Sequence, residues 1–210
     1  MATSGTTSFN LDIDDIIQEA YERCGMRTNS GYDLKSARRS LNILFAEWGN
    51  RGIHLWKVEL KEQLLTAGTS TYSAPANAND ILEAYISTTT STTTATNDVS
   101  LTKISRSEYA ALPNKGNRGQ PSQYYVDRQT TTTITLYQTP DASTYTYLKY
   151  YYLKRIEDAG AYTNQADVVF RFIPCMVAGL AYYLSMKKAL QVIRKKIKNY
   201  MKWLINNKKN

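Results

Sequence analysis

Residues 12–56 carry two apolar stripes of helical period followed directly by a stripe of period two, an order that constrains the fold more than any other part of the chain. The first stripe consists of Ile13, Ile16, Ile17, Ala20, Tyr21 and Cys24. The second consists of Leu34, Ala37, Leu41, Leu44, Phe45 and Trp48. After residues 50–52, Trp56, Val58 and Leu60 alternate with polar residues. The pattern predicts two amphipathic helices followed by a strand that starts near residue 55.

Polar and glycine residues mark the ends of both expected helices. Asp12 or Asp14 can cap the first helix, and Gly25 provides a left-handed stop. The second helix is expected to begin near Asp33 and to end at Gly49. The linker between them is short, which predicts an antiparallel helical hairpin.

The central region contains several short strand candidates separated by clusters of Gly, Pro, Asn or Asp. Besides the strand near 55–60, they lie near 70–74, 80–88, 98–104, 122–128, 131–138 and 144–153. Residues 105–113 interrupt them with a single helical turn, which Ser105 or Ser107 opens and Pro113 closes. This spacing predicts a mainly antiparallel sheet, sandwich or small barrel.

The helical period returns near the C-terminus. One stripe comprises Val168, Val169, Phe172, Met176, Leu180, Tyr183 and Leu184, with Pro174 either in the first turn or at a kink. A last helix over residues 189–206 aligns Leu190, Ile193, Ile197, Tyr200 or Met201, and Leu204. The predicted fold class is therefore α+β: a four-helix core formed by N- and C-terminal helices, with an inserted mainly antiparallel β region. The expected divisions are 1–53 for the helical hairpin, 54–160 for the β insertion, and 161–210 for the C-terminal helices and tail.

The net charge of +8 is unevenly distributed. No acidic residue follows Asp167, whereas ten basic residues do, so the first 167 positions sum to −2. Neither a signal peptide nor an apolar run long enough for a membrane span is visible. Cys24 and Cys175 have no metal-type spacing and are expected to be buried thiols in a reducing compartment.

A tyrosine-rich strand is the first candidate interaction surface. Residues 145–155 place aromatic side chains on both faces of one strand, whereas a surface strand is normally polar on one face. Contact with another subunit and an ordinary two-layer core both explain this pattern. The candidates for a subunit interface are Tyr145, Tyr147, Tyr150, Tyr151 and Tyr152.

The basic C-terminal helix is the second candidate. It could be a solvated helix face, a peptide that docks on a partner protein, or a nucleic-acid contact. Trp203, Leu204 and Ile205, close to the chain end, favour a docking peptide over a purely electrostatic arm.

Nothing in the sequence indicates catalysis. His54 is the single histidine and no Cys/His metal cluster accompanies it, so we expect a structural role. The motifs G-x-S-x-G, P-loop and G-x-G-x-x-G do not occur. We therefore predict a protein that is not an enzyme and has no catalytic residue, metal site or cofactor. The threonine-rich tracts at 88–96 and 130–133 are expected to be strand edges and a loop, and a host-surface adhesin is disfavoured.

Two groups of motifs resemble a known family. The first runs D-I-I-x-E-A-x-E-R-x-G and then A-R-R-S-L-N-x-L-x-x-E-W-x-N-R-G-x-x-L-W, and the second is F-I-P-C-M-V-A-G-L-A-Y-Y-L-S-M-K at residues 172–187. In this order they resemble the head-to-tail adaptor proteins of short-tailed bacteriophages, also called tail tubular protein A or head completion proteins. The match covers both ends of the expected helical core, about 60 residues, while the β region matches only in pattern.

This resemblance implies a structural virion protein located at the head-tail junction and assembled in the host cytoplasm. It implies a homo-oligomeric ring, a dodecamer by the family's example, which binds the portal protein, extends the DNA channel and provides a platform for the tail nozzle or tail tube. Genomic DNA would pass through without sequence-specific binding, and no membrane would be involved. The candidates for portal docking are Arg194, Lys195, Lys198, Lys202, Trp203, Leu204 and Ile205. The alternative is a nucleic-acid-binding module that acts through the basic C-terminal helix.

Overall fold

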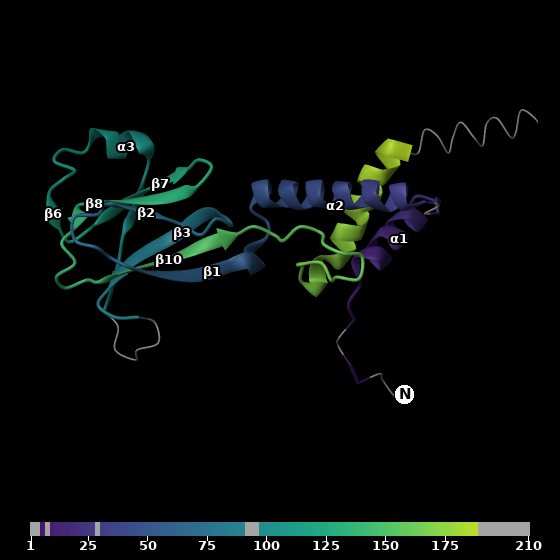
Figure 1. Cartoon of the computed structure of the whole chain (residues 1–210), viewed down its shortest axis with the longest axis horizontal. Helices are drawn as coiled ribbons and strands as arrows, with labels where there is room; N and C mark the ends of the chain where they lie inside the picture. The colour runs from purple at the N-terminus through teal and green to yellow at the C-terminus, as the bar shows by residue number, and fades with distance from the viewer. Residues whose placement is uncertain (1–4, 7–8, 28–29, 91–96, 189–210) are drawn as a thin grey trace, which may run out of the picture. The chain divides into compact units, whose positions relative to one another are not determined.

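A computed structural model of the chain describes residues 5–6, 9–27, 30–90 and 97–188. The chain divides into two compact units. A helical unit combines Met1–Gly52 with Ile156–Asn210, and a β unit comprises Ile53–Arg155. The segments at the two ends of the sequence thus belong to one unit, and the β unit is an insertion between them (Figure 1).

Two helices open the helical unit. Helix α1 spans Ile13–Arg23 and α2 spans Gly31–Arg51. The apolar stripes identified in the sequence are the buried faces of these helices, and Ile13, Ile16 and Leu41 are completely buried. Gly25 has a φ of 65°, as expected for a residue that ends α1 in the left-handed conformation.

The ends of α2 differ from the prediction. Ser30, not Asp33, is the N-cap, and its side chain accepts a hydrogen bond from the Asp33 backbone N–H. At the other end α2 continues through Gly49 to Arg51, and Gly52 adopts the left-handed conformation. Gly49 is therefore inside the helix. The positive φ that favours glycine occurs three residues later, at Gly52, and α2 ends there.

The chain returns to the helical unit at Ile156. The backbone N–H groups of Ile13 and Asp14 donate to the carbonyls of Asn164 and Tyr162, which ties this returning segment to the start of α1. A 3₁₀ turn at Phe170–Phe172 leads into a helix that is described over residues 173–188. Pro174 lies in the first turn of this helix, where a missing N–H costs nothing.

The β unit contains two four-stranded sheets and a small pair of strands. The first sheet has the order β1 (Val58–Leu64), β10 (Tyr147–Lys154), β3 (Ala78–Ser87), β4 (Asp98–Ser100). The second has the order β2 (Thr71–Ser73), β8 (Thr132–Tyr137), β7 (Gln123–Arg128), β5 (Thr102–Ile104). Strands β6 (Arg118–Gly119) and β9 (Thr139–Pro140) form the pair. Pairing is antiparallel in both sheets except between β5 and β7, and β6 and β9 are also parallel.

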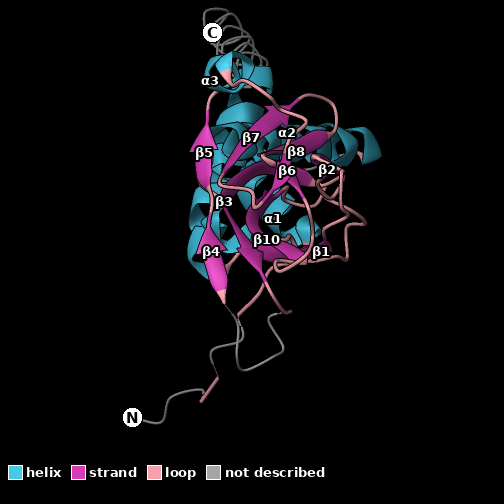
Figure 2. Cartoon of the chain, turned by 90° about the vertical axis from the view of Figure 1, so that its left-hand side faces the viewer, coloured by secondary structure: helices cyan, strands magenta, loops and turns pink. Residues whose placement is uncertain are grey.

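The two sheets form separate layers that share one hydrophobic core (Figure 1). The core combines Ile81 and Tyr150 of the first sheet with Tyr124 and Ile134 of the second, all completely or almost completely buried. Such a shared core is typical of a β sandwich. Helix α3 (Arg106–Ala111) follows β5 (Figure 2), where a helical turn was predicted, and of the two candidate caps Ser105 opens it through a capping box with Glu108.

The fold class is α+β, as predicted from the sequence. The strand expected from residue 55 begins only at Val58, because residues 55–57 form a 3₁₀ turn. Cys24 is partly buried, whereas Cys175 is exposed on the helix over 173–188, so the prediction of two buried thiols is wrong for Cys175. The last helix of the expected four-helix core, residues 189–206, lies outside the described residues.

Candidate interaction surfaces

Strand β10 carries the tyrosines that the sequence singled out, and its two faces differ in burial. Leu148, Tyr150 and Tyr152 point into the sandwich core. Burial raises the pKa of Tyr150 to about 12, so its side chain is neutral at any physiological pH. Tyr152 donates a hydrogen bond to Glu59 of the neighbouring strand at 2.8 Å. Tyr150 and Tyr152 are thus core residues of the β unit itself.

The opposite face of β10 is partly open. Tyr151 is 40% exposed and Tyr147 is half-buried, whereas Tyr145, which precedes β10, packs against the sandwich core. Tyr151 lies opposite Leu60 of β1, and Tyr147 lies opposite Leu64, which is 60% exposed. Opposed residues of neighbouring strands share a face of the sheet. We call this set of Leu60, Leu64, Tyr85, Tyr147 and Tyr151 the outer face.

A buried ion pair lies within the outer face. Lys149 is between Tyr147 and Tyr151 on the strand, yet its side chain is only 4% exposed. Its Nζ lies 3.2 Å from a carboxylate oxygen of Asp98, which keeps the buried charge compensated. The ring of Tyr85 meets the ring of Tyr151 edge to face, with centroids 6.5 Å apart. The outer face therefore combines partly exposed Leu and Tyr side chains with charged residues, since Glu62 and Glu83 lie on the same side of the sheet as Lys149 and Tyr151.

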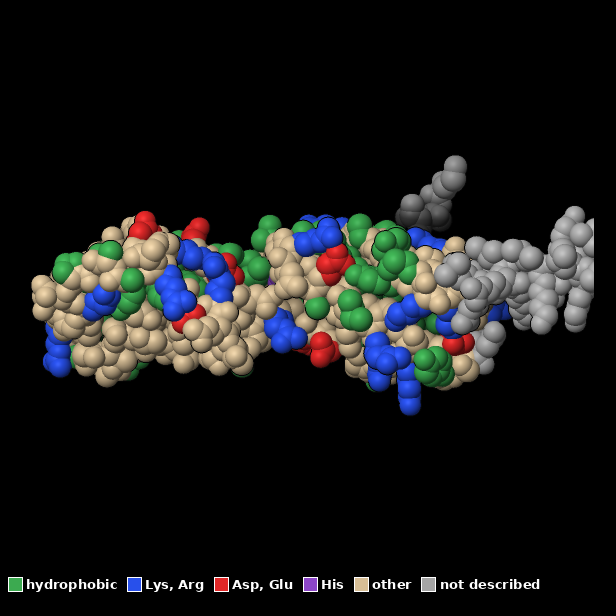
Figure 3. Space-filling view, turned by 90° about the horizontal axis from the view of Figure 1, so that it is seen from above, with side chains coloured by type: hydrophobic (Ala, Val, Ile, Leu, Met, Phe, Trp, Pro, Cys, Tyr) green, Lys and Arg blue, Asp and Glu red, His purple; other side chains and the backbone are tan. Residues whose placement is uncertain are grey.

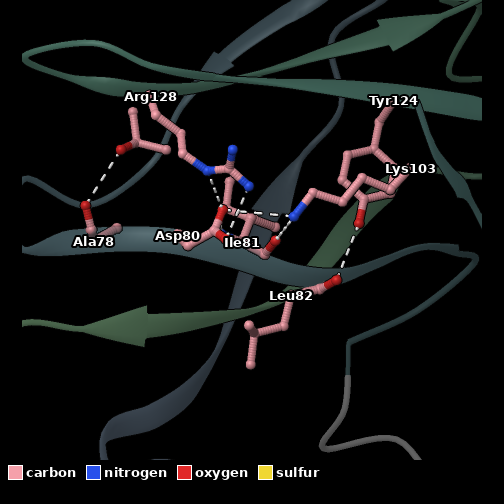
Figure 4. A network of polar contacts seen from close by, with 8 residues as sticks. Ala78, Asp80, Ile81, Leu82, Lys103, Tyr124 and Arg128 are labelled. Atoms are coloured by element: carbon pink, nitrogen blue, oxygen red, sulfur yellow. Dashed lines mark hydrogen bonds and ion pairs between the residues drawn. The ribbon is translucent and has the colours of Figure 1, made fainter. Parts of the chain in front are cut away.

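A polar network joins the two sheets of the β unit (Figure 4). Asp80 on β3 accepts two hydrogen bonds from Arg128 on β7, and it also lies 3.5 Å from Nζ of Lys103. Burial alone would raise the pKa of Asp80, but Arg128, the Ile81 backbone N–H and Lys103 outweigh it, so the pKa lies below its usual value. No sequence pattern indicates this network, because its members are far apart along the chain.

The portal-docking candidates Arg194, Lys195, Lys198, Lys202, Trp203, Leu204 and Ile205 lie outside the described residues. The structure describes the helix that leads to them. Near its end, Lys188 pairs with Asp33 of α2, and Lys187 donates to the Ser40 hydroxyl. Lys188, the last described residue before this segment, is thus held against α2.

The charge of the chain is concentrated in that segment. Residues 189–210 contain seven basic residues and no acidic one, which leaves nineteen basic and eighteen acidic residues in the rest of the chain. Over the described surface visible in Figure 3, basic and acidic side chains are interspersed with hydrophobic ones. The described parts are therefore nearly neutral, and the basic character belongs to residues 189–210.

The single histidine does not form a metal site with other described residues. His54 is completely buried at the start of the β unit, where its ring contacts Trp56 edge to face. Within the described ranges, no group of three or more His, Cys, Asp or Glu residues is arranged to hold a metal ion. Among the described residues, none of the helices is long and apolar enough to span a bilayer.

Comparison with known families decides the identity. Residues 6–199 match the family described as SU10 adaptor protein, which is nearly the whole chain. The chain belongs to the SU10 adaptor protein family. The match covers the helical unit, the β unit and part of the basic segment, so the resemblance seen in the terminal motifs is confirmed over the β region as well. No individual curated protein matches the chain.

Membership places the chain among the structural proteins of bacteriophages. An SU10 adaptor protein is a virion component, and the family is not a known enzyme family.

Proposed function

We propose that this adaptor forms a homo-oligomeric ring between the portal and the tail, where it extends the DNA channel and carries the tail nozzle or tube. Family membership supports the portal and tail proteins as partners. The observation that supports the ring is the outer face, where the side chains of Leu60, Leu64 and Tyr151 are each more than one third exposed. Contiguous exposed apolar surface rimmed by polar residues marks protein interfaces.

A ring also requires two different surfaces on each copy. A head-to-tail contact closes only when one surface of a subunit fits a different surface of its neighbour. In this proposal the β unit provides the contacts to neighbouring copies through Tyr147 and Tyr151 of the outer face. The helical unit faces the portal, and the basic segment that follows Lys188 docks on the portal.

The docking step fits the chemistry of the segment. Residues 189–210 combine seven positive charges with Trp203, Leu204 and Ile205. Aromatic and aliphatic anchors supply most of the affinity in protein interfaces, and surrounding charges steer the encounter. A partner groove with an apolar floor and acidic rim would receive such a segment.

The experiment is electron microscopy of the full chain mixed with its portal. The unmodified chain should add a ring of density below the portal. A variant with Trp203→Ala, Leu204→Ala and Ile205→Ala should not attach, although it stays folded by circular dichroism. Lys35→Ala with Lys61→Ala is a control that changes two exposed lysines outside the segment, and it should attach normally. Normal attachment of the triple variant would contradict the docking assignment, and a missing ring with the unmodified chain would contradict the function.

A further inference from the structure

A groove crosses the helical unit between α1 and the helix over 173–188. It has a volume of about 590 Å³. Leu11, Ile173, Pro174 and Val177 provide its apolar lining, and Ile173 and Val177 are themselves buried in the unit. Phe9 lies at the groove, 61% exposed, with its ring edge to face against the exposed Phe170. The groove is therefore ordered by packing, and it exposes aromatic surface.

The polar lining of this groove is acidic. Asp15, Glu19 and Glu22 line it from α1, and Arg23 is its one basic residue. Arg23 is paired with Glu19 at 2.8 Å. Among the described residues, Asp15 and Glu22 form no ion pair. The groove therefore combines an apolar floor with a net negative charge, whereas the other described residues of the helical unit are nearly neutral in sum.

Residues 189–210 match this groove in both charge and apolar pattern. The segment carries seven basic residues and no acidic residue. Ile193, Ile197, Tyr200 and Leu204 recur at offsets 0, 4, 7 and 11, the spacing with which an amphipathic helix lays one face into a hydrophobic groove. On that spacing Arg194, Lys196 and Lys208 flank the apolar face, where they can meet the carboxylates on the rim, whereas Lys195, Lys198 and Lys202 lie on the opposite side of the helix.

The position of the groove indicates that the segment comes from another copy. The groove lies at the start of the helix over 173–188, whereas the segment begins after its other end, about 24 Å away at the rise of an α-helix. To fold back in the same chain, the segment would have to reverse before its first anchor, Ile193. Residues 189–192, in which that reversal would have to occur, contain none of the Gly, Pro, Asn, Asp or Ser residues that favour turns.

We propose that the groove binds the basic C-terminal segment of a second copy of this chain. The contact is head-to-tail, because the groove of one copy receives the segment of the next. This contact forms in the free protein, before the protein binds the portal. When the same segment binds the portal, the segment leaves the groove. The proposal therefore does not depend on whether the portal is the segment's final partner.

Photo-cross-linking on the full chain tests the proposal. A benzophenone amino acid replaces Gln18, an exposed residue that lines the groove. After irradiation, mass spectrometry should find Gln18 cross-linked to peptides from residues 189–210. With equal amounts of chains made in light and heavy nitrogen, peptides that join a light to a heavy chain should be as frequent as peptides that join like chains. The same amino acid at Thr71, exposed on β2, is the control and should not capture the segment.

Charge reversal adds a second readout. Glu19→Lys with Glu22→Lys should lower the yield several-fold, and so should Arg194→Glu with Lys196→Glu and Lys208→Glu. Combining both sets should restore the yield, because opposite charges then face each other again. Cross-links within single chains only, no capture of the segment, or yields that charge reversal leaves unchanged would each overturn the proposal. None of these results depends on the portal, so failure here is distinguishable from failure of portal attachment.

Discussion

Arg128 binds Asp80 through two parallel hydrogen bonds, Nε to Oδ1 at 2.8 Å and Nη2 to Oδ2 at 3.0 Å. Asp80 belongs to β3 of the first sheet, and Arg128 belongs to β7 of the second. The pair thus connects the two layers of the sandwich between the start of β3 and the end of β7, in addition to the shared hydrophobic core. This bidentate arrangement is the one in which an arginine and a carboxylate interact most strongly.

The first prediction concerns the stability of the β unit. Arg128→Ala should lower the free energy of unfolding by about 1 kcal/mol, a modest loss because the arginine is more than half exposed and water screens the pair. Urea unfolding followed by circular dichroism measures the change. Arg106→Ala removes an arginine that is exposed on α3 and should have a smaller effect. Equal effects of the two substitutions would show that the pair contributes no specific stability.

The second prediction concerns pH. The pKa of Asp80 is lower in the folded chain than its usual value, so its carboxylate favours the folded state. This contribution is complete above the unfolded pKa, roughly pH 4, and it is lost as the pH falls through the folded pKa. Asp80→Asn should therefore be less stable than the unmodified chain at neutral pH, and the difference should shrink below about pH 4. A difference that stays constant from neutral to acid pH would contradict this assignment.

The third prediction concerns packing between helices of the helical unit. A Cβ placed on Gly179 would lie 3.0 and 3.1 Å from the two terminal carbons of Leu44 on α2, so the helices approach closely here. Gly179→Val should cost about 1–3 kcal/mol, as overpacking of a core generally does. Ala178→Val, one position earlier and exposed, is the matched control for the helix propensity of valine. Thermal unfolding of the two variants should differ clearly, and similar melting temperatures would contradict the close approach.

The fourth prediction concerns thiol reactivity. Cys24 is partly buried, burial raises the pKa of its thiol, and the Sγ atom lies 3.1 Å from the Ala181 carbonyl. Because the thiolate is the reactive form, Cys24 should react slowly with iodoacetamide. Cys175 is exposed and should be alkylated first, which peptide mass spectrometry at successive times would show. Alkylation of both residues at the same rate would contradict the placement of Cys24.

Features that depend on neighbours in the sequence were predictable. The buried face of α1 follows directly from the spacing of Ile13, Ile16 and Ile17. The short helix after Ser105 was expected for the same reason, although the sequence left Ser105 and Ser107 as alternative caps and the structure shows Ser105 with Glu108. The cap of α2 was not, because Ser30 and Asp33 are both good N-caps, and the position of the backbone decides between them.

Features that depend on pairing across the chain were not predictable. Asp80 and Arg128 are separated by 48 positions, and no local pattern relates them. The parallel pairing of β5 with β7 likewise depends on the path of the whole β unit. Alternation along β10 separated its two faces, but only the second sheet, which covers Tyr150, determines which face is the inner one. The groove on the helical unit arises from segments at opposite ends of the sequence.

The last prediction tests the outer face as a subunit contact by comparing two adjacent tyrosines of one strand. Tyr151 is 40% exposed, so Tyr151→Ala removes little from the core of the β unit and should change its stability only slightly. Tyr150 is completely buried, so Tyr150→Ala should cost about 3–5 kcal/mol, as the loss of a buried aromatic side chain does. If the outer face joins neighbouring copies, Tyr151→Ala should reduce ring formation with the portal while its monomer unfolds almost like the unmodified chain. Urea unfolding and electron microscopy of the same preparations separate the two effects. Rings of Tyr151→Ala that form as readily as those of the unmodified chain would assign the subunit contact to another surface.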